Sequence, residues 1–405
     1  MLMKKLRVGI LFGGRSGEHE VSLLSAASVL KAIDRKKYEV HLIGITREGR
    51  WLTSEDAAGL LPQPVSAGAP RLRAGNPEST PGAAVLERGQ DVLVAPVPAQ
   101  AQASGNALAT LRASAETSLG VDVIFPVLHG TYGEDGTVQG LLELADIAYV
   151  GSGVLGSAAG MDKDVMKRLF LAAGLPIPKH RTVLRHQWRS SARRVRQQLE
   201  ADLRYPFFVK PANLGSSVGI SKVHDRGELD AAMDLAASFD RKIVVEQGIG
   251  GKRGKARELE VAVLGNDAPE ASVVGEIVPS KEFYDYEAKY LSEGSAAIIP
   301  AKLTREESKR VREMAIAAFR ACDCAGMARV DFLMEPAPAP GKTGAATRPR
   351  KIYLNEVNTL PGFTSISMFP KLWQASGVSY PQLMDRLIEL AMERHREKQN
   401  NRYNL

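Results

Sequence analysis

The sequence predicts an α/β protein with more than one domain, and three observations support this fold class. An apolar run, a glycine-rich turn and a helical pattern open the chain, the order typical of an open parallel α/β domain. From about residue 204 the pattern changes to strands of the antiparallel type. The 405 residues are enough for two or three domains.

The composition is that of an ordinary globular protein, with 44% hydrophobic and 24% charged residues. The two cysteines, Cys322 and Cys324, form neither a disulfide framework nor a good zinc site, which favours a reducing cytosol. The first 14 residues have too short an apolar core for a signal peptide, and the uncharged stretch 92–111 is too polar to span a membrane. We therefore expect a cytoplasmic protein with no membrane partner.

The net charge of +7 raises the alternative of a nucleic-acid-binding protein. The densest basic stretch is KHRTVLRHQWRSSARRVRQQLE, residues 179–200. No aromatic stacking pattern or known nucleic-acid motif accompanies it, so a solvated helix face explains it better. We expect no nucleic-acid partner.

The first strand and helix follow from residues 6–34. LRVGILFGG is an apolar strand that ends in glycines, and residues 15–34 then have apolar residues at helical spacing. Glu18 and Glu20 fall at the helix start, where an acidic residue stabilises the positive end of the helix dipole. Capping explains both, but Glu20 could instead project into a site above the sheet and bind a substrate ammonium group.

A second buried strand is predicted at residues 121–130, VDVIFPVLHG. His129 lies at its carboxyl end, where open α/β sheets bind ligands, so both a structural and a functional role remain open. The preceding segment 56–119 is rich in alanine, proline and glycine and is interpreted as loop.

The segment GSGVLG, residues 151–156, matches the dinucleotide-binding pattern G-x-G-x-x-G. The acidic residue expected about 20 positions later is missing, so a turn is favoured over a nicotinamide site. A helix follows that begins near Lys163 and ends at Gly174.

Residues 205–223 predict a strand, a glycine- and serine-rich loop and another strand. The loop NLGSSVG offers the backbone N–H groups and hydroxyls that a phosphate chain needs, and Lys210 precedes it. The segment is not a Walker A loop, and an ordinary hairpin turn is the alternative.

The next elements complete an antiparallel pattern. A helix is predicted at 226–240, a strand at 242–249 and another strand within 252–265, on which Glu258 and Glu260 share a face. The polar, aromatic segment 280–295 lacks periodicity and predicts a lid, with Lys289 and Tyr290 as its most reactive members. Helices are expected at 304–321 and near the C-terminus.

The stretch from Arg329 carries the most informative side chains. Two strand-like runs, RVDFLM and KIYLNEVN, flank a tract rich in proline and glycine. If they pair as a hairpin, Asp331 lies near Glu356 or its neighbour, with Arg329 and Asn358 on the same patch. Oxygen ligands without histidine or cysteine suit Mg²⁺, and the arginine suits an anion. A solvated hairpin with a charged outer face is the alternative.

Six motifs follow one another along the chain: FGGRSGEHEVSL, HGTYGEDGTVQG, KPANLGSSVG, FYDYEAKY, ARVDF and NEVNTLPGFTSIS. Together they resemble the D-alanine–D-alanine ligases of the ATP-grasp superfamily. The resemblance covers nearly the whole chain and is weakest at 56–119 and 335–350. It implies ATP-dependent ligation of two D-alanines through an acyl phosphate, for the synthesis of a peptidoglycan precursor.

The resemblance also implies a division into an N-terminal open parallel α/β substrate domain (1–150) and an ATP-grasp pair of α+β subdomains. The central subdomain would span 151–250, and the C-terminal one 251–405 with the lid at 280–295. The catalytic residues that the resemblance implies are Glu20, Ser216, Tyr290, Arg329 and Gly362. In the family, the glutamate holds the ammonium group of the first D-alanine, the serine–tyrosine pair closes the lid, and the last two donate to the oxyanion.

The remaining site residues fall into three groups by the same resemblance. The D-alanine pockets contain His129, Ser367 and Met368. ATP is bound by Lys163, Lys210, Ser217, Glu246, Gln247, Ile249, Glu258 and Lys289. The metal ligands are Asp331, Glu356 and Asn358.

The expected cofactors are ATP and Mg²⁺ or Mn²⁺, with two ions, and a homodimer is one option for the assembly. Other ATP-grasp carboxylate–amine ligases, including those that make D-alanyl-D-lactate, are the main alternative. The neutral Tyr290 favours a second substrate with an amine, because a cation there would repel an ammonium group. A nicotinamide-dependent dehydrogenase built on GSGVLG is a further alternative.

Overall fold

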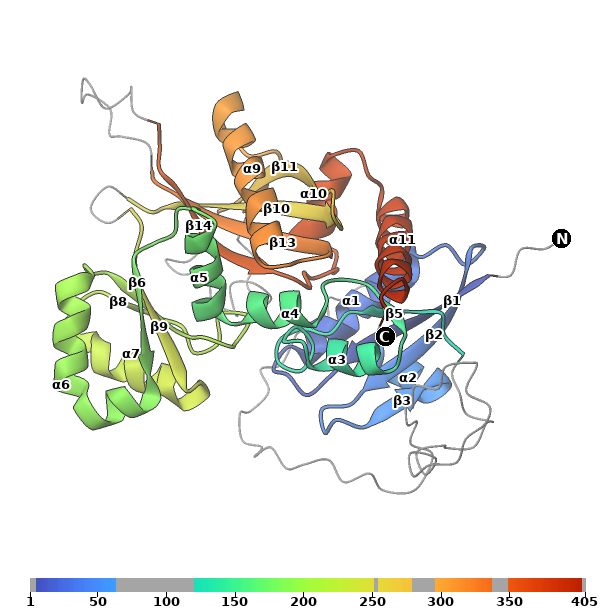
Figure 1. The fold of residues 1–405 in the computed structure, drawn as a ribbon, viewed down its shortest axis with the longest axis horizontal. Helices are drawn as coiled ribbons and strands as arrows, with labels where there is room; N and C mark the ends of the chain where they lie inside the picture. Colours follow the sequence, from blue (N-terminus) through green and yellow to red (C-terminus); the bar gives the residue numbers. More distant parts are fainter. Residues whose placement is uncertain (1–4, 63–119, 251–253, 279–295, 337–348, 403–405) are drawn as a thin grey trace.

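The computed structural model describes residues 5–62, 120–250, 254–278, 296–336 and 349–402 (Figure 1). The described chain contains three β-sheets, each with helices packed against it. No helix in this part of the chain is long and apolar enough to cross a membrane. The segment 280–295, with Lys289 and Tyr290, and most of the hairpin tract 335–350 lie outside the described residues.

The first sheet has the strand order β3-β2-β1-β4-β5. Its strands are β1 (Leu6–Gly13), β2 (Tyr38–Ile45), β3 (Trp51–Thr53), β4 (Val123–Pro126) and β5 (Ala148–Tyr149). Neighbouring strands are parallel except at the edge, where β3 runs antiparallel to β2. The helices of this part are α1 (His19–Ala32), α2 (Ser54–Leu60), α3 (Thr137–Leu144) and α4 (Val154–Met161). The predicted parallel α/β opening is confirmed.

The second sheet is antiparallel, with the order β6-β9-β7-β8. Its strands are β6 (His180–Leu184), β7 (Phe207–Pro211), β8 (Ser221–Val223) and β9 (Lys242–Gln247). Helices α6 (Arg185–Asp202) and α7 (Arg226–Phe239) pack against it (Figure 1). The basic stretch 179–200 forms β6 and most of α6. Only Trp188, Val195 and Leu199 of α6 are buried, so its arginines lie on the solvated side.

The third sheet is also antiparallel and has the order β12-β11-β10-β13-β14. Its strands are β10 (Arg257–Gly265), β11 (Glu270–Val278), β12 (Ala296–Ile298), β13 (Gly326–Met334) and β14 (Ile352–Asn358). Two helices, α5 (Lys163–Ala172) and α9 (Arg305–Ala321), contribute Met166, Phe170 and Phe319 to its core. Helix α5 thus belongs to the third sheet's core although the chain continues from it into the second sheet.

Helix α11 (Tyr380–Gln399) returns to the first sheet, whereas α10 (Met368–Ala375) packs on β10 and β11 of the third sheet. Leu383, Leu387 and Ile388 of α11 are buried in the same apolar core as β1 and β4, and Figure 1 shows α11 beside β5. Ser379 caps α11 together with Gln382, and a proline occupies its first turn, as expected for a helix start. The buried apolar side chains of α11 are therefore the surface that it packs on the first sheet.

Candidate active site

Two adjoining cavities lie where the three sheets meet. The first, of about 170 Å³, is lined by the loops after β1 and β4, the loop after β7 and the ends of β13 and β14. The second, of about 470 Å³, lies between the second and third sheets. Ser217, Ile220, Glu260, Arg329 and Glu356 line both cavities. A ligand could therefore extend from one cavity into the other.

The hairpin predicted from Arg329 onward is confirmed. Asp331 on β13 lies opposite Glu356 on β14, and Arg329 lies opposite Asn358. On the other side of β13, Asp331 lies opposite Glu260 of β10. Opposite residues of an antiparallel pair share a face of the sheet, so three carboxylates form a row across three neighbouring strands.

Arg329 is the counter-ion of this row. Its Nε and Nη2 atoms donate to the two oxygens of Asp331 at 2.8 and 2.7 Å, and Nε lies 3.3 Å from Glu260 Oε2. Burial alone would lower the pKa of Arg329, but the charges of Asp331 and Glu260 raise it well above its ordinary value. The arginine is therefore a fixed cation at the junction of the two cavities.

The donor types around Asp331 suit a hard divalent cation, since Glu356 and Asn358 add carboxylate and amide oxygens. In the part of the chain that the structure describes, no three histidine, cysteine or acidic side chains are arranged as a metal centre. Arg329 takes both oxygens of Asp331, and the Asn358 amide oxygen accepts from Leu360 N at 3.0 Å. The residues fit Mg²⁺ by chemistry, and the ion would have to displace Arg329 from Asp331.

The structure brings Glu18 to the first cavity and leaves Glu20 outside it. Glu18 is buried and accepts a hydrogen bond from Ser216 Oγ. Glu20 is partly exposed and pairs with Arg47 at 2.5 Å. Glu18 precedes helix α1, which begins at His19, whereas Glu20 lies in its first turn, and the two side chains have different surroundings. Glu20 is the residue expected to bind a substrate ammonium group, but the structure places Glu18 at the cavity instead.

Glycines make room for the Glu18 carboxylate. A Cβ atom on Gly130 would come within 2.7 Å of Glu18 Oε2, and one on Gly215 within 2.9 Å. Gly130 also has a φ of +75°, which side chains rarely adopt. The motifs that contain these glycines thus admit a carboxylate between the loops after β4 and β7.

The loop after β7 places its two serines in the left-handed region, with φ of 48° at Ser216 and 61° at Ser217. This conformation is uncommon for residues other than glycine and clusters at functional sites. Lys163, at the start of α5, donates from Nζ to Leu214 O at 2.6 Å in the same loop. The predicted phosphate loop and the predicted phosphate lysine are thus in direct contact.

The predicted strand 121–130 is shorter in the structure, so His129 lies in the loop three residues after β4, and it is buried in the wall of the first cavity. Its Nε2 atom is 3.0 Å from Ser25 Oγ, and Nδ1 is 3.6 Å from Glu134 Oε1. Burial tends to lower the pKa of His129, but the Glu134 carboxyl raises it above its ordinary value. Burial in turn raises the pKa of Glu134. The sequence reasoning missed Glu134, although it stands in the same motif five residues after His129.

Three further predicted residues line the first cavity: Gly362, Ser367 and Met368. Ser367 Oγ accepts from Thr364 N at 3.0 Å and lies 2.8 Å from Thr364 Oγ1. A Cβ atom on Gly362 would come within 2.8 Å of the same Oγ, so the turn requires a glycine there. These residues lie at the end of the cavity nearest α10.

The second cavity contains most of the residues predicted to bind the nucleotide, whereas Lys163 lines the first cavity. Its lining includes Lys210, Ser217, Glu246, Gln247, Ile249 and Glu258. Glu246 accepts from Lys210 Nζ at 3.1 Å on one oxygen, and its other oxygen lies 3.1 Å from Lys167 Nζ. Burial would raise the pKa of Glu246, but the two ammonium groups lower it to about 2.

Lys167 was not singled out from the sequence, and it is among the most deeply buried side chains of the protein. Besides Glu246 it contacts Asn355 O at 3.3 Å, so it joins β9 of the second sheet to β14 of the third. Burial lowers its pKa, while Glu246 opposes this effect. Its position three residues before Phe170, on the apolar stripe of α5, is the signal that could have indicated burial.

Comparisons with known proteins agree with this architecture. The family model described as D-ala D-ala ligase N-terminus matches residues 7–152, and the one described as D-ala D-ala ligase C-terminus matches residues 169–389. The D-alanine–D-alanine ligase of Bacillus cytotoxicus is 47% identical over the full length of both chains. That of Geobacillus kaustophilus is 49% identical over 98% of each chain.

Two solved structures are similar over almost their whole length. The D-alanine–D-alanine ligase from Coxiella burnetii has a TM-score of 0.73 at 34% identity and covers 98% of this chain and 96% of its own. The VanG D-Ala:D-Ser ligase from Enterococcus faecalis has a TM-score of 0.71 at 33% identity and covers 96% and 100%. The second and third sheets are accordingly the two halves of an ATP-grasp fold. The chain belongs to the D-alanine–D-alanine ligase family.

Proposed function

We propose that this protein joins two D-alanines into D-alanyl-D-alanine, with conversion of ATP to ADP and phosphate, for the synthesis of a peptidoglycan precursor. The observation that carries the proposal is the junction of the two cavities. A buried carboxylate, Glu18, lies on one side, and Arg329 with its row of carboxylates lies on the other. This arrangement suits an amino acid in the first cavity that reacts with a nucleotide in the second.

The chemistry requires activation because a free carboxylate is a poor electrophile. The carboxylate of the first D-alanine would attack the γ-phosphorus of ATP, which forms an acyl phosphate and releases ADP. The amine of the second D-alanine would then attack the acyl carbon, lose a proton and expel phosphate. Positioning and charge neutralisation do most of the work in such phosphoryl transfers.

Different residues of the first cavity would bind the first and the second D-alanine. Glu18, rather than the expected Glu20, would bind the ammonium group of the first D-alanine, with His129 beside it. Ser367 and Met368 would form the pocket for the second D-alanine. Arg329 and the N–H group of Gly362 would stabilise the oxyanion of the tetrahedral intermediate. Ser216 would hold Glu18 in place, and the predicted lid residue Tyr290 would cover this serine.

The second cavity would bind ATP. Lys163, Lys210, Ser217 and the predicted lid residue Lys289 would contact the phosphates, and Gln247, Ile249 and Glu258 the nucleoside. Glu246 would orient Lys210 for this contact. Asp331, Glu356 and Asn358 would hold Mg²⁺ or Mn²⁺, which would supply charge neutralisation to the transferring phosphate. The proposal places the reaction in the cytoplasm, where ATP is available.

The test measures phosphate release from ATP and Mg²⁺ with D-alanine, L-alanine, D-serine plus D-alanine, or D-lactate plus D-alanine, with the products weighed by mass spectrometry. We expect phosphate release with D-alanine alone and the mass of the D-alanine dimer. If a mixed product forms in preference to the D-alanine dimer, the second substrate is D-serine or D-lactate and not the proposed D-alanine. No turnover with D-alanine but turnover with another amino acid would overturn the assignment of both substrate pockets.

A further inference from the structure

Three consecutive residues that precede the Ser216–Ser217 turn are tied to their surroundings. Ala212 O accepts from Lys163 N at 3.0 Å, and Ala212 N donates to Lys242 O at 3.0 Å. Leu214 O accepts from Lys163 Nζ at 2.6 Å. The position of the turn is therefore set by the start of α5 and the start of β9.

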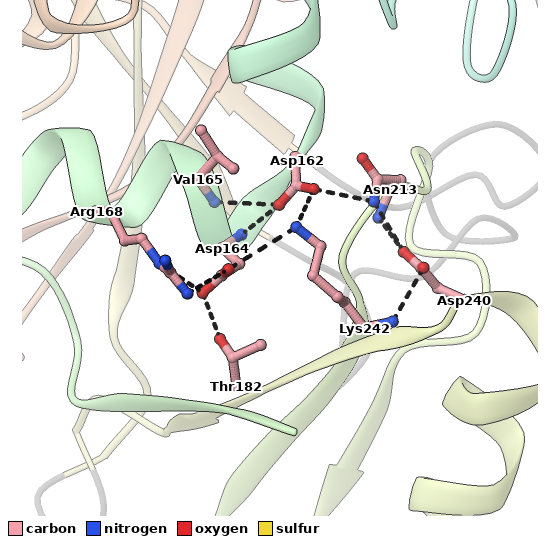
Figure 2. A network of polar contacts seen from close by, with 8 residues as sticks. All are labelled: Asp162, Asp164, Val165, Arg168, Thr182, Asn213, Asp240 and Lys242. Atoms are coloured by element: carbon pink, nitrogen blue, oxygen red, sulfur yellow. Dashed lines mark hydrogen bonds and ion pairs between the residues drawn. The ribbon is translucent and has the colours of Figure 1, made fainter. Parts of the chain in front are cut away.

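The middle residue, Asn213, lies between two aspartates, as Figure 2 shows. Its Nδ2 atom is 3.1 Å from Asp162 Oδ2 and 3.1 Å from Asp240 Oδ2, and its backbone N donates to Asp240 Oδ2 at 2.7 Å. Asp240 Oδ1 accepts from Lys242 N at 3.1 Å. The Lys242 ammonium group pairs with Asp162 and lies 3.8 Å from Asp164. Asp162, Asn213, Asp240 and Lys242 thus form a closed ring of polar contacts.

Asp162 connects this ring to helix α5. Its Oδ1 atom accepts from the backbone N of Asp164 and of Val165, both at 3.1 Å, and so caps the helix. The side chains of Asp162 and Lys242 are each only 13% exposed, so solvent screens the pair little. Burial would raise the pKa of Asp162, but the hydrogen bond from Lys242 lowers it, and the carboxylate stays charged.

The ring joins two parts of the protein that form opposite walls of the second cavity. Helix α5 is anchored in the third sheet's core by Met166 and Phe170. Asn213 and Lys242 belong to the second sheet's loop and strand. A shift of one part against the other would move Lys163 relative to the serine turn.

We propose that Lys242 is a positioning residue for the use of ATP: it acts through Asp162 and Asn213 to fix Lys163 and the Ser216–Ser217 turn relative to each other. Lys242 lines neither cavity and so acts only through these partners. The inference rests on the proposed function, because it assigns Lys163 and the turn to the phosphates of the nucleotide.

The first test compares Lys242→Met with Lys242→Arg and with the control Arg168→Met. Arg168 pairs with Asp164 at 2.9 Å, but its side chain is 71% exposed and it contacts neither Asn213 nor Asp240. Small displacements of positioned groups can cost about 100-fold in rate, so we expect Lys242→Met to lower kcat/KM for ATP about 10- to 100-fold. Lys242→Arg should recover part of this loss, and Arg168→Met should match the wild type.

The second test needs no turnover and uses hydrogen exchange of the unliganded protein, read by mass spectrometry. We expect the amides of residues 212–217 and of the first turn of α5 to exchange faster in Lys242→Met than in the wild type or Arg168→Met. Unchanged exchange together with unchanged ATP kinetics would overturn the inference. If the wild type does not ligate D-alanine, the proposed function fails, and the exchange comparison still tests the ring.

A variant that cuts the ring at the loop guards against loss of folding in Lys242→Met. Asn213→Ala removes both contacts of the side-chain amide and leaves the buried Asp162–Lys242 pair intact. The same increase in exchange at 212–217 and the same fall in kcat/KM for ATP are expected. Wild-type values in a folded Asn213→Ala protein would contradict the positioning role.

Discussion

Ser216 donates a hydrogen bond to the Glu18 carboxylate, although 198 residues separate the two in the sequence. The bond ties the loop after β7 to the start of α1 and directs the carboxylate into the first cavity. Glu20, two residues further on, faces away and pairs with Arg47. Substitution of Glu18 therefore tests the proposed ammonium site, and the same substitution at Glu20 is the control.

Glu18→Gln should lower kcat/KM for D-alanine, and Glu20→Gln should leave it near the wild-type value. Loss of one partner of a buried charged hydrogen bond costs about 2–5 kcal/mol, which corresponds to roughly 30-fold or more. Steady-state phosphate release with varied D-alanine checks this. If kcat/KM for D-alanine falls more in Glu20→Gln than in Glu18→Gln, Glu20 and not Glu18 binds the ammonium group.

Arg329→Ala should lower turnover about 100-fold, because loss of one oxyanion donor costs about 2.7–4 kcal/mol, while ATP binding is largely kept. The substitution also leaves Asp331 and Glu260 without their counter-ion. Mg²⁺ should therefore raise the melting temperature of the variant more than that of the wild type. Turnover assays and thermal melts with and without Mg²⁺ measure the two effects.

Arg350→Ala is the matched control for Arg329. Arg350 binds Glu307 through two hydrogen bonds of 2.8 and 2.7 Å at similar exposure, and it lines neither cavity. The Arg350→Ala variant should be less stable than the wild type but keep its turnover. Mg²⁺ should raise its melting temperature no more than that of the wild type. Near-wild-type turnover of Arg329→Ala would exclude the oxyanion role.

Ser217→Ala and Ser217→Gly should be equally impaired in the use of ATP but differ in stability. Both remove the hydroxyl group, whereas only glycine adopts the φ of 61° without strain. Alanine should be less stable than glycine by about 1 kcal/mol. Urea denaturation of the two variants measures this difference, and equal free energies of unfolding would contradict the strained geometry of the turn.

Glu246 should make the stability of the protein sensitive to acid. Its pKa is about 2 in the folded state against an ordinary value of 4.5, so its contribution is fully present above about pH 4.5 and is lost as the pH falls toward 2. At neutral pH, Glu246→Gln leaves Lys167 and Lys210 uncompensated and should cost about 3–5 kcal/mol.

Urea denaturation at pH 7 and at pH 3 checks this prediction. The difference in the free energy of unfolding between the wild type and Glu246→Gln should be smaller at pH 3, because the unfolded wild-type chain then binds the proton that the folded chain does not. A difference that grows on acidification would exclude the pairing of Glu246 with its two lysines.

The hairpin from Arg329 could be predicted because strand alternation fixes which side chains share a face, whatever lies around them. That rule places Arg329 with Asp331 and Glu356 with Asn358, so pairing of the two strands brings the four side chains together. The choice between Glu18 and Glu20 could not be made in this way. Both lie at the start of α1, and the exact first residue of a helix, which decides the direction of each side chain, is the least predictable part of an element.

Lys167 shows a second limit of the sequence. A lysine on a helix is ordinarily exposed, and only the arrival of β9 and β14 from distant parts of the chain supplies its partners, Glu246 and Asn355 O. The same applies to the ring around Asn213, whose members come from four separate elements and loops. Such contacts depend on the packing of the sheets against each other, which no local pattern encodes.

The packing of α11 on the first sheet has a consequence for synthesis on the ribosome. Residues 383–391 complete an apolar core that begins at Val8, so the N-terminal sheet cannot finish folding until almost the whole chain has emerged. Within the described parts of the chain, the buried core of the second sheet comes from residues between Val183 and Val245, so this sheet has no such dependence. During translation the middle of the protein can therefore fold before its beginning does.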